Sequence, residues 1–230
     1  MIRIAVAGIS GRMGAAVAQE VLKCPQCQLT LVTSRNPQAR CGLLLAVAEL
    51  SADFDVLIDF SLPAAAIKNL EFCLEHGKPM VIGATGFTDA QLAKIQAAAK
   101  VIPLLKSNNM SMGANACDLA LAQICSLLDE SWQITLEESH HQDKRDAPSG
   151  TALMFVQTIQ DNGMQPASIK SIRDQSTIGV HKITFTNADE YLELQHVALS
   201  RATFSHGALL AAKWLVQQTP SLYNMHNLQK

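Results

Sequence analysis

Residues 1–14, MIRIAVAGISGRMG, join an apolar run to a regular series of glycines. Residues 2–7 have the continuous apolar pattern of a parallel strand that is buried on both faces. Gly8, Gly11 and Gly14 follow this strand, and apolar residues then recur at helical spacing. The pattern predicts a strand, a tight turn and a helix in immediate succession.

A turn of this kind suits a dinucleotide. Glycines allow a pyrophosphate to approach the start of the helix, where unpaired N–H groups and the helix dipole favour anions. The spacing is GxxGxxG, because Ser10 replaces the middle glycine of the commoner pattern. The alternative is a glycine-rich turn that serves only packing. We predict cofactor contacts at Gly8, Ile9, Ser10, Gly11, Arg12 and Met13.

The end of the second expected strand, residues 28–33, bears on the choice of cofactor. An NAD site usually offers an acid about 20 residues after the glycine turn, to bind the ribose 2′-hydroxyl. Here the sequence reads Thr33-Ser34-Arg35-Asn36 and has no acid. A hydroxyl beside an arginine suits a 2′-phosphate, so we predict that Ser34 and Arg35 contact the cofactor and that NADPH binds at least as well as NADH. The alternative for Arg35 is a solvated loop charge.

Strands and helices alternate through the first half of the chain. Three more strands are expected at 55–60, 79–83 and 101–105, with helices at 64–76 and from Thr88 to about 100. This alternation predicts an α/β domain of the Rossmann type with a doubly wound parallel sheet. Small residues and amides follow two of the strands, as a nicotinamide pocket requires. They are Gly83, Ala84 and Thr85 after one strand, and Ser107, Asn108, Asn109 and Met110 after the other.

The pattern changes after about residue 110. Helices are expected at 113–128, from Thr151 and at 206–218, and strands at 132–138, 168–173, 181–187 and 191–196. These elements predict a smaller α+β domain with antiparallel pairing. We therefore expect a dinucleotide-binding domain formed by residues 1–110 and 205–230, and a substrate domain formed by residues 111–204.

The segment WQITLEESHHQDKRDAP, residues 132–148, concentrates groups that can carry chemistry. We expect its strand to end before two adjacent histidines, with a lysine four residues after the first and a Ser-Gly-Thr turn beyond. Imidazoles and an ammonium suit proton transfer around an anionic substrate, and N–H groups at the start of the next helix suit a carboxylate. The candidates are His140, His141, Lys144, Ser149, Gly150 and Thr151. Single histidines at 181, 196 and 206 are expected to be structural or supporting, and no spacing indicates a metal site.

Composition narrows the class of protein. The chain has 230 residues and a formal net charge of −2, which does not suggest a nucleic-acid or membrane partner. No apolar run reaches the roughly 18 residues that a membrane helix needs, and the apolar N-terminus lacks the pattern of a signal peptide. Six scattered cysteines do not suggest a disulfide framework. We expect a cytoplasmic protein, in which Cys24-Pro-Gln-Cys27 is structural.

Five segments together resemble one family, 4-hydroxy-tetrahydrodipicolinate reductase, also called dihydrodipicolinate reductase. They are GISGRMG at 8–14, DFSLP at 59–63, GATGF at 83–87, SNNMSMGAN at 107–115 and ESHHQDKRDAPSGTA at 138–152, and the similarity resumes near 200–215. The resemblance implies a homotetramer of two-domain subunits, whose substrate domain has an open mixed sheet that builds the oligomer. It also implies NAD(P)H-dependent reduction of (2S,4S)-4-hydroxy-2,3,4,5-tetrahydrodipicolinate to (S)-2,3,4,5-tetrahydrodipicolinate in diaminopimelate and lysine biosynthesis.

The resemblance also implies roles for individual residues. His140 matches the family's acid/base histidine and Lys144 its proton donor, while His141, Gly150 and Thr151 match substrate contacts, with Ser149 beside them. The sequence departs from the family at Ser34, where many members have an acid, and at Met110, where an aromatic residue is common. Two other classes remain open: another small NAD(P)-dependent dehydrogenase, and a nucleotide-binding module without catalysis.

Overall fold

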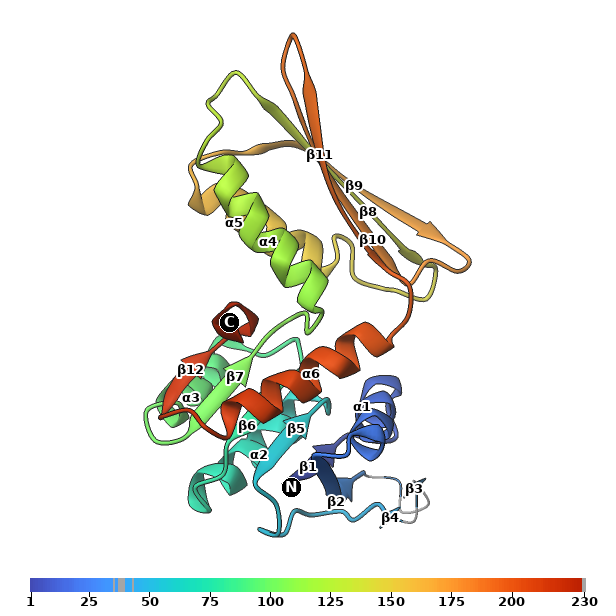
Figure 1. The fold of residues 1–230 in the computed structure, drawn as a ribbon, viewed down its shortest axis with the longest axis vertical. Helices are drawn as coiled ribbons and strands as arrows, with labels where there is room; N and C mark the ends of the chain where they lie inside the picture. The colour runs from blue at the N-terminus through green and yellow to red at the C-terminus, as the bar shows by residue number, and fades with distance from the viewer. Residues whose placement is uncertain (35, 37–39, 43, 229–230) are drawn as a thin grey trace. The chain divides into compact units, whose positions relative to one another are not determined.

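The computed structural model describes residues 1–34, 36, 40–42 and 44–228, which form two compact units (Figure 1). The first unit comprises Met1–Ser111 and Phe204–Lys230, and the second comprises Met112–Thr203. Each unit has its own sheet and its own apolar core. The predicted fold class, a Rossmann-type unit followed by a smaller unit with an open mixed sheet, is confirmed.

A six-stranded parallel sheet forms the centre of the first unit, in the order β12-β7-β6-β5-β1-β2. From β1 the chain moves outward to β2 and then crosses to β5 on the other side of β1. The carboxyl ends of β1 and β5 therefore flank the point where the winding reverses, which is where open α/β sheets bind ligands. The strands are β1 (Ile2–Ala7), β2 (Cys27–Thr33), β5 (Val56–Asp59), β6 (Met80–Ile82), β7 (Pro103–Lys106) and β12 (Ser221–Tyr223).

Helices cover both faces of this sheet (Figure 1). Successive residues of a strand point to opposite faces, so Ile4 and Val6 pack with α1 and α6, whereas Ala5 and Ala7 pack with α2 and α3. Burial on both faces explains why β1 is apolar throughout instead of alternating. The helices are α1 (Arg12–Lys23), α2 (Pro63–Glu75), α3 (Asp89–Ala98) and α6 (Ala202–Leu215).

Four short elements of the first unit were not predicted. β12 adds a parallel strand beside β7 and is followed by a 3-10 helix, Met225–Leu228. A two-stranded antiparallel pair, β3 (Arg40–Cys41) and β4 (Leu44–Leu45), lies between β2 and β5 in the sequence. Elements of two to four residues are too short to produce a hydrophobic period. The equally short β5, β6 and β7 were predicted because the sequence around each of them is mostly apolar over five or six residues. The last helix was also misplaced: α6 begins four residues earlier than the expected start at 206.

The turn between α1 and β2 holds the two cysteines of the CxxC segment. Cys24 directly follows α1, and its N–H donates to the carbonyl of Val21 at 3.1 Å. Cys27 begins β2 and is buried, and burial raises the pKa of its thiol to about 11. A thiol with so high a pKa is a weak nucleophile, which agrees with a packing role for this residue.

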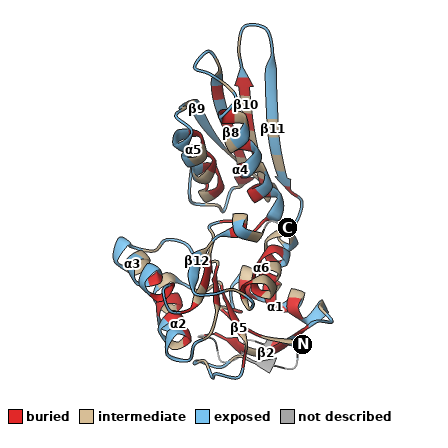
Figure 2. Ribbon diagram, turned by 60° about the vertical axis from the view of Figure 1, so that its left-hand side comes forward, coloured by how far each residue is buried: buried red, intermediate tan, exposed pale blue. Residues whose placement is uncertain are grey.

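The second unit packs two helices against one face of a four-stranded sheet in the order β11-β10-β8-β9. β10 pairs antiparallel with β8 and β11, and β8 pairs parallel with β9, so the sheet is mixed. Figure 2 shows buried residues on the inner sides of the helices and long exposed stretches along β9 and β11. The elements are α4 (Met112–Cys125), β8 (Gln133–His141), α5 (Gly150–Asp161), β9 (Pro166–Asp174), β10 (Gly179–Thr186) and β11 (Tyr191–Ala198).

The extent of β8 corrects one expectation. The strand was expected to end at residue 138, before the histidines, but it continues through His141. Pairing with β9 stabilises this extension, because His140 lies opposite Arg173 and His141 opposite Asp174. The two histidines are therefore neighbours within a strand, and strand geometry sends their side chains to opposite faces.

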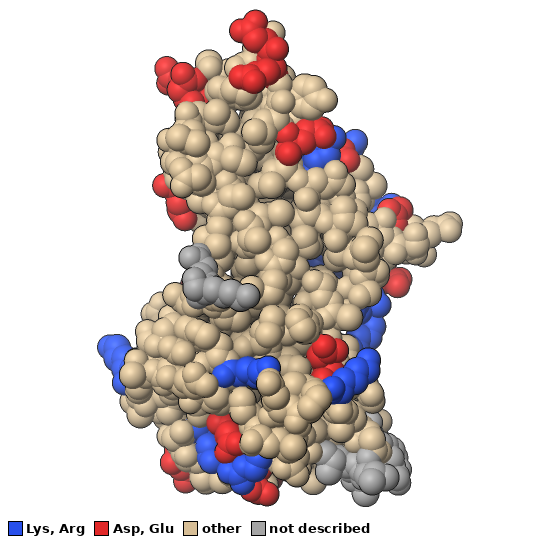
Figure 3. Space-filling model, viewed as in Figure 1, with Lys and Arg blue, Asp and Glu red and all other residues tan. Residues whose placement is uncertain are grey.

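Charged side chains of both signs are interspersed over the face drawn in Figure 3, with uncharged surface between them. Among the described helices, none is both long and apolar enough to cross a membrane.

Candidate active site

The glycine turn of the first unit is built by close contacts between backbone atoms. Gly8 has a φ of +85°, and a Cβ on this residue would lie 2.8 Å from the carbonyl oxygen of Phe60. A Cβ on Gly14 would lie only 2.2 Å from the carbonyl oxygen of Gly8. Gly11 precedes α1 and offers no side chain to cap it. The start of α1 is thus free of a side-chain cap and follows a turn whose shape depends on glycine at positions 8 and 14, which suits a bound pyrophosphate.

The other predicted cofactor residues follow strands of the same sheet. The N–H of Gly83 donates to the backbone carbonyl of Asp59 at the end of β5 (2.9 Å). The N–H of Ser107 donates to the backbone carbonyl of Ile82 at the end of β6 (3.3 Å). These segments therefore share one edge of the sheet with the glycine turn. Three of these residues are buried and can offer a ligand mainly backbone atoms: Ile9, Ala84 and Met110. Five others are exposed or partly exposed: Ser10, Gly11, Arg12, Thr85 and Asn108.

The loop after β7 is ordered by its own polar groups. The hydroxyl of Ser107 donates to the carbonyl of Asn109 at 2.7 Å, and the side-chain oxygen of Asn109 accepts the N–H of Ser111 at 2.8 Å. Neighbouring Asn108 accepts a hydrogen bond from Lys106 at 3.3 Å. The loop can thus present its backbone to a ligand without losing its shape.

Ser34 lies at the end of β2, as predicted, and is buried. Its hydroxyl accepts the N–H of Asn36 at 2.9 Å, which bends the chain into a turn at this point. Arg35 lies outside the described residues, so the expected contact of this guanidinium with a 2′-phosphate stays a prediction.

Asp59, in the DFSLP segment, is a buried carboxylate that supports the same edge of the sheet. It accepts the N–H of Ser61 at 2.7 Å and the amide of Asn69 at 2.6 Å, which joins the end of β5 to α2. Burial raises the pKa of this carboxyl group, against the effect of the two hydrogen bonds. Its role is to hold Phe60 and Ser61 in place beside the glycine turn.

In the second unit, the register of the sheet gathers four polar residues on the face that the helices cover. His181 on β10 lies opposite Glu138 on β8, and Arg173 on β9 lies opposite His140. The even-numbered positions of β8 point to the covered face, and both Glu138 and His140 are buried there. His196 on β11 extends this row, because it lies opposite His181.

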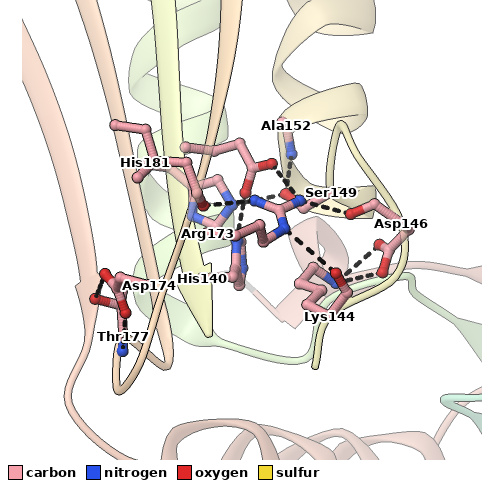
Figure 4. Close-up of polar contacts among 11 residues, drawn as sticks. His140, Lys144, Asp146, Ser149, Ala152, Arg173, Asp174, Thr177 and His181 are labelled. Atoms are coloured by element: carbon pink, nitrogen blue, oxygen red, sulfur yellow. Dashed lines mark hydrogen bonds and ion pairs between the residues drawn. The ribbon is translucent and has the colours of Figure 1, made fainter. Parts of the chain in front are cut away.

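Glu138 is the centre of this group (Figure 4). Its side chain is fully buried, it accepts a short hydrogen bond from Nδ1 of His140, and Arg173 Nη2 donates to it at 2.8 Å. Burial alone would raise the pKa of Glu138, but hydrogen bonds from Arg173, Ser171 and His140 outweigh burial and lower it. Glu138 is therefore ionised at neutral pH although it is buried.

Lys144 lies on the loop after β8 and is held by Asp146 (Figure 4). Its ammonium contacts both carboxylate oxygens of Asp146, at 2.8 and 2.9 Å. Burial acts to raise the pKa of Asp146, but the hydrogen bond from Lys144 and the N–H of Gly150 at the start of α5 lower it overall. Lys144 and the start of α5 thus already bind one carboxylate, which belongs to the chain itself.

Ser149 begins α5 and links it to the sheet. Its hydroxyl accepts the N–H of Ala152 at 3.1 Å, which caps the helix, and lies 3.0 Å from Nε2 of His181. Burial lowers the pKa of His181 to about 3, and the nearby His140 and His196 act in the same direction. His181 is therefore neutral at physiological pH. Because the Ser149 side chain is buried and already bonded, a ligand at this point would meet the backbone of Gly150 and Thr151.

His141 does not join this group. It points to the face of the sheet opposite His140, and its Nδ1 lies 4.0 Å from a carboxylate oxygen of Asp143. The structure thus brings together His140, Lys144, Ser149 and Gly150 through shared partners, and it places His141 apart from them.

Sequence reasoning missed Glu138 and Arg173 and treated His181 as a single histidine. Strand alternation could have found Glu138, which is two residues before His140 and so shares its face. Arg173 and His181 depend on the pairing of β8 with β9 and β10, which no local pattern specifies. Donor atoms of Glu138, His140 and His181 lie within 4.8 Å of one another, a spacing that could hold a metal ion. Arg173 already supplies a cation to Glu138.

A dinucleotide turn at the switch point of a parallel sheet, and a buried histidine–carboxylate group with a lysine in a second unit, define an NAD(P)-dependent oxidoreductase. Comparisons with known proteins then specify the family. Residues 2–110 match the family model of the dihydrodipicolinate reductase N-terminus, and residues 113–228 match that of its C-terminus. The chain belongs to the dihydrodipicolinate reductase family, and the resemblance described above is confirmed.

Individual relatives agree with this assignment. A 4-hydroxy-tetrahydrodipicolinate reductase of Syntrophotalea carbinolica is 33% identical over 263 aligned positions, covering 99% of this chain and 98% of the relative. A dipicolinate-bound dihydrodipicolinate reductase from Paenisporosarcina sp. TG-14 has the same fold, with a TM-score of 0.85, 23% identity and full coverage of both chains. An amine dehydrogenase from Mycobacterium smegmatis is more distant, with a TM-score of 0.71, 13% identity, and coverage of 100% of this chain and 96% of the other.

Proposed function

We propose that this chain catalyses the NAD(P)H-dependent reduction of (2S,4S)-4-hydroxy-2,3,4,5-tetrahydrodipicolinate to (S)-2,3,4,5-tetrahydrodipicolinate, with loss of water, in diaminopimelate and lysine biosynthesis. The family, which spans almost the whole chain, supports this reaction. So does the curated relative of that name. The observation that carries the proposal is the helix start beside Lys144, which already binds a carboxylate and would receive one from a dicarboxylate substrate.

The glycine turn and the three strand ends beside it would hold the dinucleotide. The start of α1 would bind the pyrophosphate, and the close backbone contacts of Gly8 and Gly14 would hold the turn in the shape that leaves this helix start open to it. When bound, the reduced nicotinamide supplies the hydride for the reaction. We propose the following contacts: Gly8, Ile9, Ser10, Gly11, Arg12, Met13, Ser34, Arg35, Gly83, Ala84, Thr85, Ser107, Asn108, Asn109 and Met110.

The preference between the two nicotinamide cofactors follows from the end of β2. The described residues there include Ser34 and no acid, so a 2′-phosphate would meet no carboxylate repulsion from this segment. We propose that NADPH is used at least as well as NADH. Michaelis constants that favour NADH by more than about tenfold would contradict this inference.

On the substrate side, one carboxylate would bind the N–H groups of Gly150 and Thr151 together with Lys144. A ligand that does so must replace Asp146, so the site exchanges one carboxylate for another. Such binding orients the ring, which is a large part of the help that an enzyme gives to a reaction of this kind. His140 or Lys144 would then supply the proton that balances hydride transfer. His141 remains a candidate contact, although its side chain points away from His140.

The assay for this proposal follows the oxidation of NADPH while the preceding enzyme of the pathway generates the unstable substrate in the same solution. Consumption of NADPH that requires both this chain and the substrate supports the proposal. Binding of NADPH without turnover would contradict it and would favour a module that only binds nucleotide. Turnover with an amino acid instead would favour another dehydrogenase.

The uncovered face of the second sheet supports a homotetramer. Ile172, Ser139, Val180 and Val197 lie side by side across the four strands on the face opposite His140. Val197 is 45% exposed, and Leu199, just beyond β11, is 87% exposed. We propose that copies of the chain associate through this face in the cytoplasm. A mass in solution of four times 24.8 kDa is expected, and a stable monomer would contradict the proposal.

A further inference from the structure

The arginine at the end of β9 is bonded to both parts of the proposed catalytic group. Its Nη2 donates to Glu138 at 2.8 Å, and the same guanidinium donates to the backbone carbonyls of Lys144, at 3.3 Å from Nε, and of Asp146, at 2.6 Å from Nη2. Figure 4 shows Arg173 between His140 and the loop that carries Lys144. A planar guanidinium carries five donors in a fixed arrangement, so it can hold all these acceptors at once.

Glu138 holds His140 by a hydrogen bond, as Arg173 holds the loop that carries Lys144. Because the carboxylate is ionised and fully buried, the imidazole nitrogen beside it, Nδ1, must carry a hydrogen. The other nitrogen, Nε2, then exchanges the proton with a ligand. Nε2 lies near the backbone of β10, 3.1 Å from the point where a Cβ on Gly179 would be, so a glycine at this position leaves room beside it.

We propose that Glu138 and Arg173 are positioning residues, which fix the tautomer of His140 and tie the Lys144 loop to the same carboxylate. His140 and Lys144, the two groups proposed to move protons, are thereby held in a fixed arrangement relative to each other. This inference rests on the proposed reductase function, because it assigns His140 and Lys144 their roles in that reaction. It adds to the proposal two residues that do not touch the substrate themselves.

A single isosteric substitution separates positioning from general structural support. In Glu138→Gln, the side-chain oxygen must turn to Arg173, because arginine can only donate hydrogen bonds. The amide NH2 then faces Nδ1 of His140, which must accept, so the neutral ring is forced to carry its hydrogen on Nε2. Loss of the negative charge also lowers the pKa of His140 further, because the carboxylate opposes the effect of burial.

Four ionisable side chains surround His140, each from a different element. Glu138 contacts it along β8, Arg173 faces it from β9, His181 packs against it from β10 at a ring-centroid distance of 5.1 Å, and Lys144 approaches from the loop. Burial lowers the pKa of His140, and Lys144 and Arg173 act in the same direction, so Glu138 is the group that favours the protonated ring.

The test compares the wild-type chain with Glu138→Gln, Glu138→Asp and a matched control, Glu137→Gln. Glu137 is the next residue of β8, faces the other side of the sheet and pairs with Lys170 at 3.1 Å. Steady-state rates are measured across pH, and the tautomer of His140 is read from the 15N shifts of its ring, assigned with a His140→Gln variant. Circular dichroism checks that each variant is folded.

For Glu138→Gln we expect a fall in kcat of at least about tenfold at neutral pH, with a much smaller change in KM. We also expect the limb of the pH profile that needs protonated His140 to move to lower pH, and the ring hydrogen to move from Nδ1 to Nε2. Glu138→Asp keeps the charge and should return that limb towards its wild-type position. Glu137→Gln should keep the ring hydrogen of His140 on Nδ1 and leave the position of that limb unchanged, including when its association through the opposite face of the sheet is altered.

Failure of this inference and failure of the proposed function give different results. If the wild-type chain is active and Glu138→Gln retains its rate, pH profile and tautomer, the positioning role is wrong and the reductase assignment stands. If the wild-type chain has no reductase activity, the proposed function fails, but the NMR measurement needs no turnover and still tests the positioning. A wild-type His140 with its neutral-state hydrogen on Nε2 would overturn the inference, even if Glu138→Gln did not fold.

Discussion

The glycine turn of the first unit and the histidine group of the second are built from different parts of the polypeptide. In the turn, Gly8 and Gly14 lie so close to other backbone atoms that a side chain is excluded at both positions, and a Cβ on Gly14 would lie 2.2 Å from a carbonyl oxygen. The histidine group consists of buried and partly buried side chains, each bonded to a specific partner on the same strand, on the neighbouring strand β9 or at the start of α5. The first site should therefore be sensitive to any added volume, and the second to small changes in charge or hydrogen bonding.

The largest effects should come from the side chains that move protons. His140→Ala and Lys144→Ala are each expected to lower kcat by about 10²–10⁴-fold, which is the usual contribution of a positioned general acid. KM should change less for His140→Ala, because Lys144 also binds the substrate carboxylate. Steady-state kinetics would measure both constants, and near-normal turnover in both variants would contradict the assignment.

A pair of glycine-to-alanine substitutions would test the contrast between the two units. In Gly14→Ala the new methyl group overlaps the backbone of Gly8, so we expect a loss of stability of about 3 kcal/mol and weaker NADPH binding. Gly150→Ala places its methyl group in open space, with nothing within 4 Å, at the first position of α5. Its stability in urea should match or exceed that of the wild type, since alanine favours helix. Equal stabilities for the two variants would contradict the claim that the glycine turn is more sensitive to added volume than the start of α5.

The histidine group should make stability depend on pH. Burial holds the pKa of His181 at about 3, against an ordinary value of 6.5, with His140, His196 and Lys144 acting in the same direction. The folded chain thus binds fewer protons than the unfolded chain between these values, so stability is complete above about pH 6.5 and falls as the pH is lowered. Between about pH 7 and pH 5 we expect a loss of roughly 2 kcal/mol from this residue.

Urea denaturation at the two pH values would measure the loss, and His181→Gln should reduce it because an amide does not titrate. A slope that is unchanged in His181→Gln would show that the pH dependence comes from other groups.

The smallest effects should distinguish two helix caps. Ser149 caps α5 in a buried site and also bonds His181, whereas Thr88 caps α3 at an exposed capping box with Gln91. Ser149→Ala should cost about 2 kcal/mol, because it also leaves His181 without this partner, and Thr88→Ala about 1 kcal/mol. Chemical denaturation of both variants would rank them, and a larger loss for Thr88→Ala would argue against a buried network around Ser149.

Most of the first unit could be predicted because its signals are local. Apolar runs, glycines and the Thr88 cap mark strands, turns and a helix start within a few residues, and the structure has them at nearly those positions. The histidine group could be predicted only in part. His140 and Lys144 stand out by type and spacing. Arg173, however, follows its partner Glu138 by 35 residues, and His181 follows its partner Ser149 by 32 residues. Their place depends on strand register, which is a tertiary property.

The error at β8 has the same origin. Polar residues and two histidines do not form an apolar alternation, so the sequence suggested that the strand ends early. Pairing of Ile134–His141 with β9 keeps the chain extended through His141 and separates the two histidines onto different faces. The separation changes the expected site, because His140 then shares a face with Glu138 instead of with its neighbour.

The most direct test of the account is the transfer of deuterium from NADPH labelled at the hydride position of its nicotinamide ring. The substrate is generated in situ, and the product is analysed by mass spectrometry. We predict that the tetrahydrodipicolinate formed carries one deuterium, and that this product is almost absent with His140→Ala. Oxidation of NADPH that leaves the product unlabelled, or labelled product at the wild-type rate with His140→Ala, would contradict the account.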